Sequence, residues 1–592
     1  MFKPTSRQRT LFETEQRLTD SVRRRLKGTW AEGFQSKVLP LLLDAEMEFA
    51  ALYSDETGRP NWSAARMLGI CVLQEMLGLD DQSALDSLAF DVRWQHALGL
   101  EPEEAYLSRR SLVEFRSRLV AEDPEMKALR RLFERVGDAA VDELGLSTKE
   151  QRVDSTLVTS NIFTRGRVEL FRKTLVHFMD WLSKEHPDRL ERLSRFTRKW
   201  YEETKGQGWF GKVDKDKAKQ QAAVLAERLY EVVRTFGEDD EVKDGEPYLL
   251  VARLFAEHCV VEKAADPKDG DNGEGCGEKG VPTPKLVLRD KLEAPSCSLQ
   301  SPYDPDAGYG YKGPGYLVHV AETCNNERTE IITDYGVVPA GETDRGKDAD
   351  IIERLCEAGR QPEVLYEDGG YPTGQGIIDA ARKGTEIVAP MTGGRLPEDT
   401  IGRERFEFDA TTGHCMRCPE GHAPLRHDLR TTYQNNPPTL HAYFDGDTCR
   451  ACALQSRCVV RPPNNGKKGS FHLELGAHLV VRDQALASQQ DDAWWDRYKI
   501  RAGIEATMSE LKRGHGLGKL RVRRAPRVLL AVGLKVTACN VKRWLRADSV
   551  AERAAELARA SVCVANEACQ ALWRFLTRLC RRSWPIRSPI AA

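Results

Sequence analysis

The chain has 592 residues, 30% of them charged, which is enough material for about three to five domains. It lacks both the roughly 18 consecutive apolar residues of a membrane helix and the apolar centre of a signal peptide. We therefore expect a cytoplasmic protein whose 15 cysteines are thiols or metal ligands rather than disulfides. The net charge of −2 gives no general attraction to nucleic acid, but local basic clusters leave DNA binding open.

Residues 1–145 are predicted to form a helical domain. Apolar residues recur at helical spacing in three segments, residues 39–52, 63–77 and 108–119. Ser108 is a suitable N-cap for the third helix, whose polar face is rich in arginine and suits contact with DNA. An ordinary helical bundle with a charged surface is the alternative. The candidate DNA-binding residues of this helix are Arg109, Arg110 and Arg116.

The middle of the chain is predicted to form a mixed α/β sheet. A short strand is followed by a helical insert and by a flexible linker rich in glycine and acidic residues. A hairpin turning at Asn325-Asn326, a helix, a strand, a helix with Pro372 near its first turn, and a further strand complete the pattern. Without the insert, this order gives a mixed sheet with helical crossovers. The expected elements lie at residues 151–159, 168–261, 264–280, 315–324, 328–338, 347–358, 363–367 and 385–390.

A polar face on one helix near the end of the chain is the strongest indication of function. At about 100° per residue, Tyr498, Arg501, Glu505 and Lys512 fall within an arc of roughly 60°. Glu510, the other acid of this helix, projects away from that face. A tyrosine, two cations and a carboxylate suit a surface that holds a metal ion beside a phosphodiester.

The sixteen residues that begin at Lys512, KRGHGLGKLRVRRAPR, add seven Lys or Arg and no acid. This basic run is expected to bind DNA through phosphates. Its candidate contacts, besides Lys512, are Arg513, Lys519, Arg521 and Arg523.

Two aspartates complete a set of three carboxylates from distant parts of the chain. Asp154 lies inside an apolar strand, where an unpaired carboxylate is costly to bury. Asp368 ends another strand, at the sheet edge where α/β proteins bind ligands, and is followed by two glycines that would let a ligand approach the backbone. Together with Glu505 they suit hard divalent cations such as Mg²⁺. Isolated aspartates at strand ends are, however, more often caps.

These residues resemble the bacterial insertion-sequence DDE transposases. The spacing Tyr498-x2-Arg501-x3-Glu505-x6-Lys512 matches the Y-R-E-K signature of that family. The segments HGLGKLRVRR, NVKRW and SRRSLVEFRSRL are also similar, so the resemblance extends to about Trp544.

Asp154 in RVDST resembles the first aspartate of the family and Asp368 in EDGGY the second. The resemblance implies an RNase-H-like core in which Asp154, Asp368 and Glu505 hold two Mg²⁺ ions, with Mn²⁺ as a substitute. It also implies cleavage of the element's terminal inverted repeats, strand transfer into target DNA, and a homodimer on double-stranded DNA near the nucleoid. Tyr498, Arg501 and Lys512 would hold phosphates or bases. Arg501 could instead pair with a carboxylate of the core.

Five cysteines in a polar insert form a second candidate metal site. Cys415-x2-Cys418 and Cys449-x2-Cys452 have the form of a zinc knuckle, and Cys458 makes five thiols for four positions. His414 and His422 could also serve as ligands. The insert has few apolar residues, so structural Zn²⁺ would supply folding energy; unmetallated thiols are the alternative. Cysteines in apolar helices, Cys539 among them, are expected to be core.

The sequence thus predicts a DNA-binding domain, a catalytic core interrupted by two inserts, and a basic helical tail. Two alternatives to an active transposase remain: a DNA-binding relative that has lost catalysis, and an RNase-H-like nuclease without strand transfer. The expected boundaries are 1–145 for the N-terminal domain, 146–165 with 285–393 and 486–546 for the core, 166–284 for the helical insert and linker, 394–485 for the cysteine-bearing insert, and 547–592 for the tail.

Overall fold

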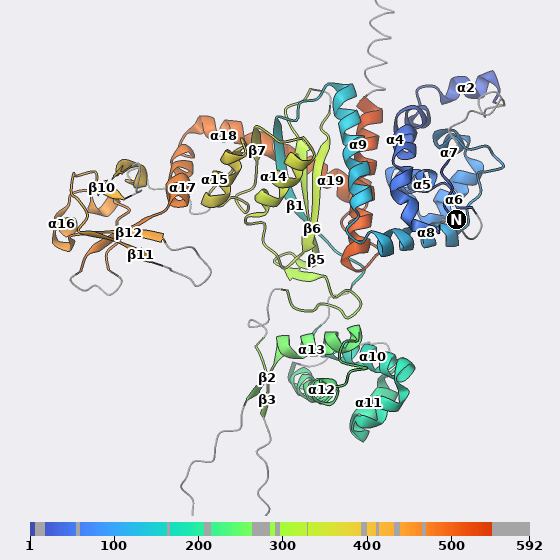
Figure 1. Cartoon of the computed structure of the whole chain (residues 1–592), viewed down its shortest axis with the longest axis horizontal. Coiled ribbons are helices and arrows are strands. Elements are labelled where there is room, and N and C mark those ends of the chain that lie inside the picture. Colours follow the sequence, from blue (N-terminus) through green and yellow to red (C-terminus); the bar gives the residue numbers. More distant parts are fainter. Residues whose placement is uncertain are drawn as a thin grey trace, which may run out of the picture.

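A mixed sheet lies at the centre of the computed structural model, with groups of helices and a small β-rich insert around it (Figure 1). The predicted linker at 264–280 and the predicted tail beyond residue 547 lie outside the described residues. The structure describes residues 1–5, 18–54, 60–162, 166–206, 215–262, 285–290, 297–327, 329–391, 400–409, 414–430, 439–463 and 469–547.

The N-terminal part is helical, as predicted. Ser63 and Ser108 accept hydrogen bonds from Arg66 N and Ser111 N and so cap α5 and α8. The predicted helix at 39–52 is divided into an α-helical and a 3₁₀ segment. The elements are α2 (Asp20–Leu26), α3 (Trp30–Gly33), the π-helix η1 (Phe34–Val38), α4 (Leu39–Asp44), η2 (Glu46–Leu52), α5 (Ala64–Leu77), α6 (Asp81–Phe90), α7 (Val92–Leu98), α8 (Arg109–Glu122) and α9 (Lys127–Leu144).

The apolar face of the last described helix, residues 525–547, packs into the same core as these N-terminal helices. Leu530, Leu534 and Trp544 are buried there. In Figure 1 this helix, coloured red, lies beside α9. The N-terminal helices and the C-terminal part of the core are therefore joined by one hydrophobic cluster.

The central sheet has the strand order β4-β5-β1-β7-β8, and β6 pairs with the other edge of β5. β1 and β6 run antiparallel to β5, whereas β1, β7 and β8 are parallel to one another. The predicted hairpin is present, and Asn325 at its turn has a positive φ of 69°. The strands are β1 (Glu150–Val158), β4 (Gly308–Gly310), β5 (Gly313–Thr323), β6 (Ile332–Pro339), β7 (Val364–Tyr366) and β8 (Glu386–Val388).

Two helices provide the crossovers, α14 (Lys347–Glu357) before β7 and α15 (Gly374–Arg382) before β8. Thr373 is the N-cap of α15, so Pro372 precedes the helix instead of lying in its first turn. The helix thus starts at Gly374, two residues after Pro372.

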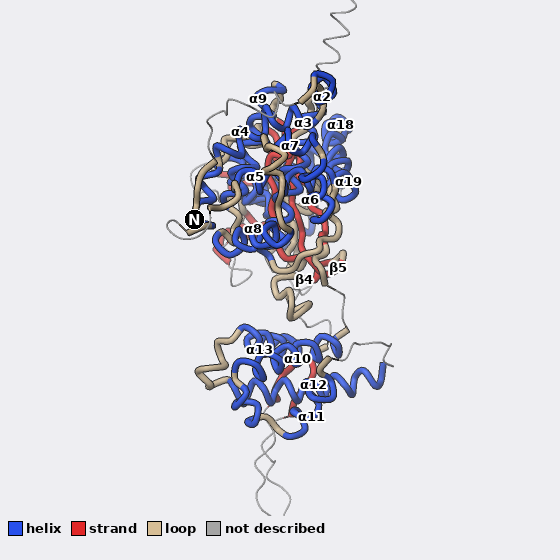
Figure 2. The backbone as a smooth tube through the Cα atoms, turned by 90° about the vertical axis from the view of Figure 1, so that its right-hand side faces the viewer, coloured by secondary structure: helices blue, strands red, loops and turns tan. Residues whose placement is uncertain are grey.

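The helical insert follows β1 and lies below the sheet in Figures 1 and 2. It has its own core, which includes Phe171, Phe178 and Leu229. Glu246 of this insert forms an ion pair of 2.7 Å with Arg524. Its elements are α10 (Arg167–Glu185), η3 (Pro187–Arg192), α11 (Arg195–Thr204), α12 (Lys215–Phe236), α13 (Glu246–His258), β2 (Cys259–Glu262) and β3 (Lys285–Leu288).

The cysteine-bearing insert is a small β-rich unit with a core that includes Phe406, Phe444 and Leu473. β11, β12 and β13 form an antiparallel sheet, and β9 pairs with β10. Its elements are η5 (Arg403–Arg405), β9 (Glu407–Phe408), β10 (Cys415–Arg417), β11 (Arg426–Arg430), β12 (Thr439–Phe444), α16 (Gly446–Ala451), η6 (Gln455–Arg457) and β13 (Phe471–Leu475), followed by α17 (Ala477–Ser488).

The segment that carries the polar face is not one α-helix. It consists of α18 (Asp492–Tyr498), the 3₁₀ segment η7 (Lys499–Gly503) and α19 (Ile504–Gly514). The apolar side of α19, with Ile504 and Leu511, packs against the sheet residues Val318 and Val320. No helix in the described part of the chain is long and apolar enough to cross a membrane.

Candidate functional site

Asp154 lies on β1, and Asp368 follows the end of the parallel neighbour β7. β1 pairs with β7 so that Arg152 is opposite Tyr366. The same register, continued by two residues, places Asp154 beside Asp368 on one face. Burial raises the pKa of Asp154; Arg501 and the backbone N–H of Ser155 oppose this rise, and the charge of Asp368 adds to it.

Arg501 connects the first and third carboxylates. Its Nη2 lies 2.9 Å from Oδ2 of Asp154, and its Nη1 lies 3.9 Å from Oε1 of Glu505. The Arg501 side chain is 14% exposed and that of Glu505 is 71% exposed. Glu510, by contrast, forms an ion pair of 2.9 Å with Arg543. Arg501 is thus near Glu505 as well as Asp154, whereas Glu510 is paired with Arg543.

Tyr498 lies near Arg501 and the two aspartates. Its hydroxyl donates to the carbonyl of Glu367 at 3.0 Å, and its ring stacks on Trp494 with centroids 5.3 Å apart. Burial raises the pKa of Tyr498 to about 12. Arg501 opposes this rise, and the charges of Asp368 and Asp154 add to it. Tyr498 is thus neutral at physiological pH and anchors α18 to the end of β7.

Gly369 also has a structural role in the turn that holds Asp368. A Cβ at this position would lie 2.6 Å from the carbonyl oxygen of Pro390. Because Gly369 has no side chain, the backbone at Pro390, just after β8, can pack directly against the turn that holds Asp368. The backbone N–H of Gly369 also donates to Oδ1 of Asp368 at 2.7 Å.

A pair of buried acids behind the site was missed by sequence reasoning. Glu367 is fully buried, and both of its carboxyl oxygens have no hydrogen-bond partner in the structure. Burial, and then the charge of Asp348, raises the pKa of Glu367 well above its usual range. Burial likewise raises the pKa of Asp348 to about 6. The adjacency of Glu367 to Asp368 in the sequence was the available signal, but a strand-end acid is usually exposed.

His319 and Tyr371 form a further buried contact. Nδ1 of His319 lies 2.7 Å from the Tyr371 hydroxyl, and the two rings meet edge to face. Tyr371 lies close enough to Asp154 for the aspartate to raise its pKa, an effect secondary to burial and to Asp344. His319 of β5 thus has one partner, in the turn that follows Asp368, while its Nε2 has no hydrogen-bond partner in the structure.

The basic run lies alongside the end of β1. Thr159 N donates to the carbonyl of Gly518 at 3.1 Å, and Leu520 N donates to the carbonyl of Thr159 at 2.8 Å. Lys512, Arg513, Lys519 and Arg521 are exposed. Arg523 is half-buried, because its Nε donates to the carbonyl of Asn161 at 2.6 Å.

The arginines of α8 have different environments. Arg109 and Arg110 are exposed, and Arg110 forms an i,i+4 ion pair with Glu114. Arg116 instead forms an ion pair of 2.8 Å with Asp81 and donates to the Gln74 side chain, which ties α8 to α5 and α6.

Four of the five insert thiols line one cavity of about 150 Å³. They are Cys418, Cys449, Cys452 and Cys458. Burial, and then the neighbouring thiols, raises the pKa of Cys449 to about 11. Cys415 lies on β10, and its thiol donates to the carbonyl of Arg417 at 3.7 Å. The thiols that line this cavity are soft ligands of the kind that suits Zn²⁺.

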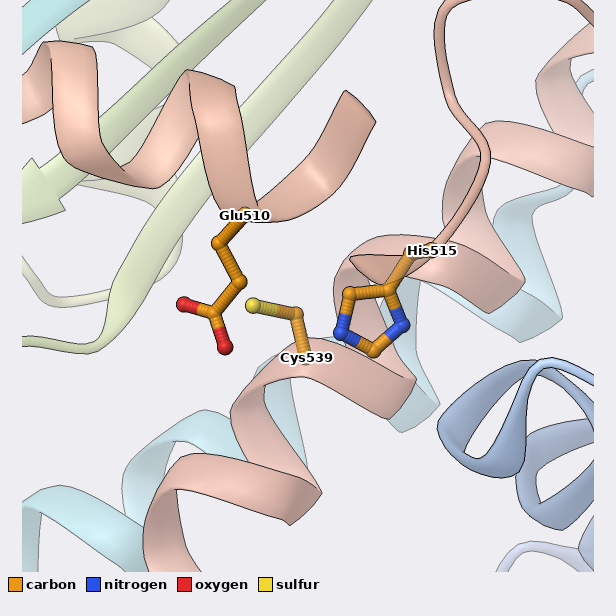
Figure 3. Close-up of side chains that lie close together, drawn as sticks. All are labelled: Glu510, His515 and Cys539. Carbon is orange, nitrogen blue, oxygen red and sulfur yellow. The ribbon is translucent and has the colours of Figure 1, made fainter. Parts of the chain in front are cut away.

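A third group of potential metal-ligand atoms lies outside both the carboxylate site and the cysteine-bearing insert. Among the residues that the structure describes, one group of His, Cys, Asp or Glu has ligand atoms that all lie within 4.8 Å of one another: Glu510, His515 and Cys539 (Figure 3). Within the same residues, the insert thiols and the three carboxylates do not reach this spacing.

Two regions match known protein families. Residues 417–545 match the model described as Transposase DDE domain, and residues 33–118 match the Transposase domain (DUF772). The first match contains Glu505 and four of the five cysteines, the second contains α8 up to Arg118, and neither includes Asp154 or Asp368. Comparison with curated proteins and with solved structures gave no match.

Proposed function

We propose that this chain, which its two family matches indicate to be an insertion-sequence DDE transposase, cuts the ends of its element and joins them to target DNA at the site between β1, β7 and α19. The observation that carries the proposal is the position of Arg501, which lies near both Asp154 and Glu505. The charge of Asp368 in turn raises the pKa of Asp154. Three carboxylates from distant parts of the chain thus share one site beside a basic surface.

The sheet supports an RNase-H-like core. β6, β5 and β1 are antiparallel neighbours, and β7 and β8 continue the sheet in parallel from β1. In this arrangement the first acid lies within the central strand and the second at the end of its parallel neighbour. α19 then supplies the third acid from a helix that packs on the sheet.

The donor set fits two Mg²⁺ ions, with Mn²⁺ as a substitute. Asp154, Asp368 and Glu505 offer carboxylate oxygens, which are the ligands that hard divalent cations prefer. The raised pKa of Asp154 reflects a carboxylate held in a poorly solvated place beside a second one, an arrangement that a cation stabilises. When bound, two such ions activate an attacking oxygen and stabilise the leaving oxygen at phosphorus.

The surrounding residues of this chain orient the reactants. Arg501 favours the charged form of Asp154 and holds it near Glu505. Tyr498 fixes α18 against the strand end that presents Asp368. Lys512 and the exposed cations Arg513, Lys519 and Arg521 would bind phosphates next to the scissile position, since phosphate contacts position DNA without reading its sequence.

The N-terminal helices would hold the element's inverted repeat. Arg109 and Arg110 are exposed on α8 and available to DNA, whereas Arg116 positions the helix through Asp81. Because two element ends must be joined together, we propose a homodimer on DNA. The cysteine-bearing insert would hold one structural Zn²⁺ through Cys418, Cys449, Cys452 and Cys458, with Cys415 outside the ligand set.

A strand-transfer assay tests the proposal and separates it from a plain nuclease. The purified protein would receive a pre-cleaved element end, a target plasmid and Mg²⁺. We expect covalent joining of the 3′ end to the target. Hydrolysis of the target without any joined product would overturn the proposed function in favour of a nuclease, and binding without cleavage or joining would indicate an inactive DNA-binding relative.

A further inference from the structure

A buried cluster of three potential metal ligands lies away from the proposed catalytic carboxylates. Glu510 comes from α19, His515 from the turn that follows it, and Cys539 from helix 525–547. Their ligand atoms all lie within 4.8 Å of one another. Figure 3 shows the three side chains directed toward one another from these separate segments. His515 and Cys539 are buried, with exposures of 3% and 0%.

His515 is oriented as a metal-binding histidine would be. Its Nδ1 lies 3.0 Å from the carbonyl oxygen of Glu75, an arrangement that places the ring proton on Nδ1. Nε2 then carries the lone pair. It is buried and has no hydrogen-bond partner in the structure. A histidine that donates its other N–H to a backbone carbonyl is the usual support for a metal ligand, and a buried ring nitrogen without a partner is otherwise costly.

The other two groups, a hard carboxylate and a soft thiolate, complete a mixed donor set with the borderline imidazole. Glu510 is held by Arg543, whose Nε and Nη2 lie 3.0 and 2.9 Å from its Oε2. Cys539 would bind as a thiolate and release its proton to solvent. A carboxylate and a thiolate together balance a divalent charge. Thiolate and imidazole ligands favour zinc-class ions over Mg²⁺.

We propose that Glu510, His515 and Cys539 bind one divalent transition-metal ion of the zinc class, which links the helix carrying Glu505 to the shared N-terminal core. The cluster already contacts the N-terminal helices. Lys535 donates to the carboxylate of Glu75, which belongs to α5, and to the carbonyl of His515. The ion would hold the end of α19 in register with helix 525–547, and its role is structural.

Metal content of the full-length protein tests this site independently of DNA chemistry. A Cys449→Ser/Cys452→Ser background removes the site proposed in the insert. After dialysis, we expect this variant to retain about one equivalent of zinc per chain. Absence of bound zinc, together with failure to bind added Co²⁺, would overturn the proposal, and this result does not depend on any substitution in the buried cluster.

Substitutions in the same background then identify the ligands. Cys539→Ser should lose the metal and the thiolate-to-Co²⁺ charge-transfer band, whereas Cys324→Ser, at another buried cysteine, should keep both. His515→Ala should lose the metal, and His515→Cys, which restores a ligand but not the hydrogen bond to Glu75, should bind it again. Retention of the full metal content by both Cys539→Ser and His515→Ala would contradict the assignment.

Discussion

At the scale of single residues, Arg501 is the cation that contacts two of the three proposed catalytic carboxylates. It lies within 4 Å of two of the three carboxylates and is itself largely buried. A guanidinium can contact two acids at once because its donors are fixed in a planar fork, whereas a lysine ammonium is a single point charge. Arg501 therefore acts as a positioning residue for Asp154 and Glu505 in addition to any contact with DNA.

Arg501→Lys should reduce strand transfer by about ten- to hundredfold, because the positive charge is kept but the two acids lose their common support. End binding, measured by gel shift, should change little. The matched control is Arg497→Lys, since Arg497 of α18 forms a more exposed bidentate pair with Glu386 of β8. Equal losses in the two variants would show that the effect is not specific to the site.

The residue spacing of the polar face predicted that Arg501 and Glu505 would be neighbours, since residues four apart face each other on a helix. It left open whether Arg501 would serve DNA or a core carboxylate, and the structure shows the contact with Asp154. The buried pair Glu367 and Asp348 was not predictable. Their proximity arises from the packing of α14 against the sheet, which no local pattern encodes.

At the scale of elements, the interruption between α18 and α19 has a physical cause. Nη1 of Arg152, on β1, lies 2.9 Å from the carbonyl oxygen of Ile500. In an uninterrupted α-helix that carbonyl would accept from the residue four positions later. The Arg152 guanidinium also occupies the space of a Cβ at Gly503, at 2.0 Å. The 3₁₀ segment thus follows from a contact with a strand far away in sequence, so helical periodicity alone could not predict it.

The helical insert should be sensitive to acid through His258. This side chain is 7% exposed, and neither ring nitrogen has a hydrogen-bond partner in the structure. Burial, and then the charge of Arg167, lowers its pKa to about 4. Between pH of about 6.5 and about 4 the unfolded insert binds more protons than the folded one, so its stability falls as the pH falls through this window, by up to about 3 kcal/mol.

Hydrogen exchange of peptides from α10 and α13 measures this effect. Their protection should decrease on acidification in the unaltered protein and should become much less pH-dependent in His258→Leu. His186→Gln, at a more exposed histidine of the same insert, is the control and should keep the acid sensitivity. An unchanged acid response in His258→Leu would exclude His258 as its source.

At the scale of the whole molecule, the shared core joins the first and last parts of the described chain. Trp544 is 2% exposed and packs in the same cluster as α4, α5 and Ile331, the residue that precedes β6. Trp544→Ala should destabilise the protein by about 3–5 kcal/mol. Because the core is continuous, peptides from α5 and from β6 should lose exchange protection together.

Phe196→Ala provides the comparison, since this aromatic side chain is 82% exposed and its removal should have little effect. Loss of protection confined to the N-terminal helices in Trp544→Ala would mean that the helical module is stabilised separately from the sheet.

The order of strands and crossover helices was predictable, because strand-length apolar runs and capped amphipathic helices carry local signals. The shared core was not, since the apolar residues of the sequence from 528 to 544 are compatible with packing against any partner. The sequence likewise placed Cys539 in the core but gave no indication that His515 and Glu510 would meet it. Such contacts depend on tertiary packing between distant segments.

The most direct test of the central claim is the activity of Glu505→Gln, which removes one proposed metal-binding charge while preserving size. Cleavage of the element end and strand transfer in Mg²⁺ should fall by at least about a thousandfold, with end binding nearly unchanged. Glu353→Gln, at an exposed glutamate of α14, should remain active. Cleavage and joining by Glu505→Gln at the rate of the unaltered protein would contradict the assignment of Asp154, Asp368 and Glu505 as one catalytic site.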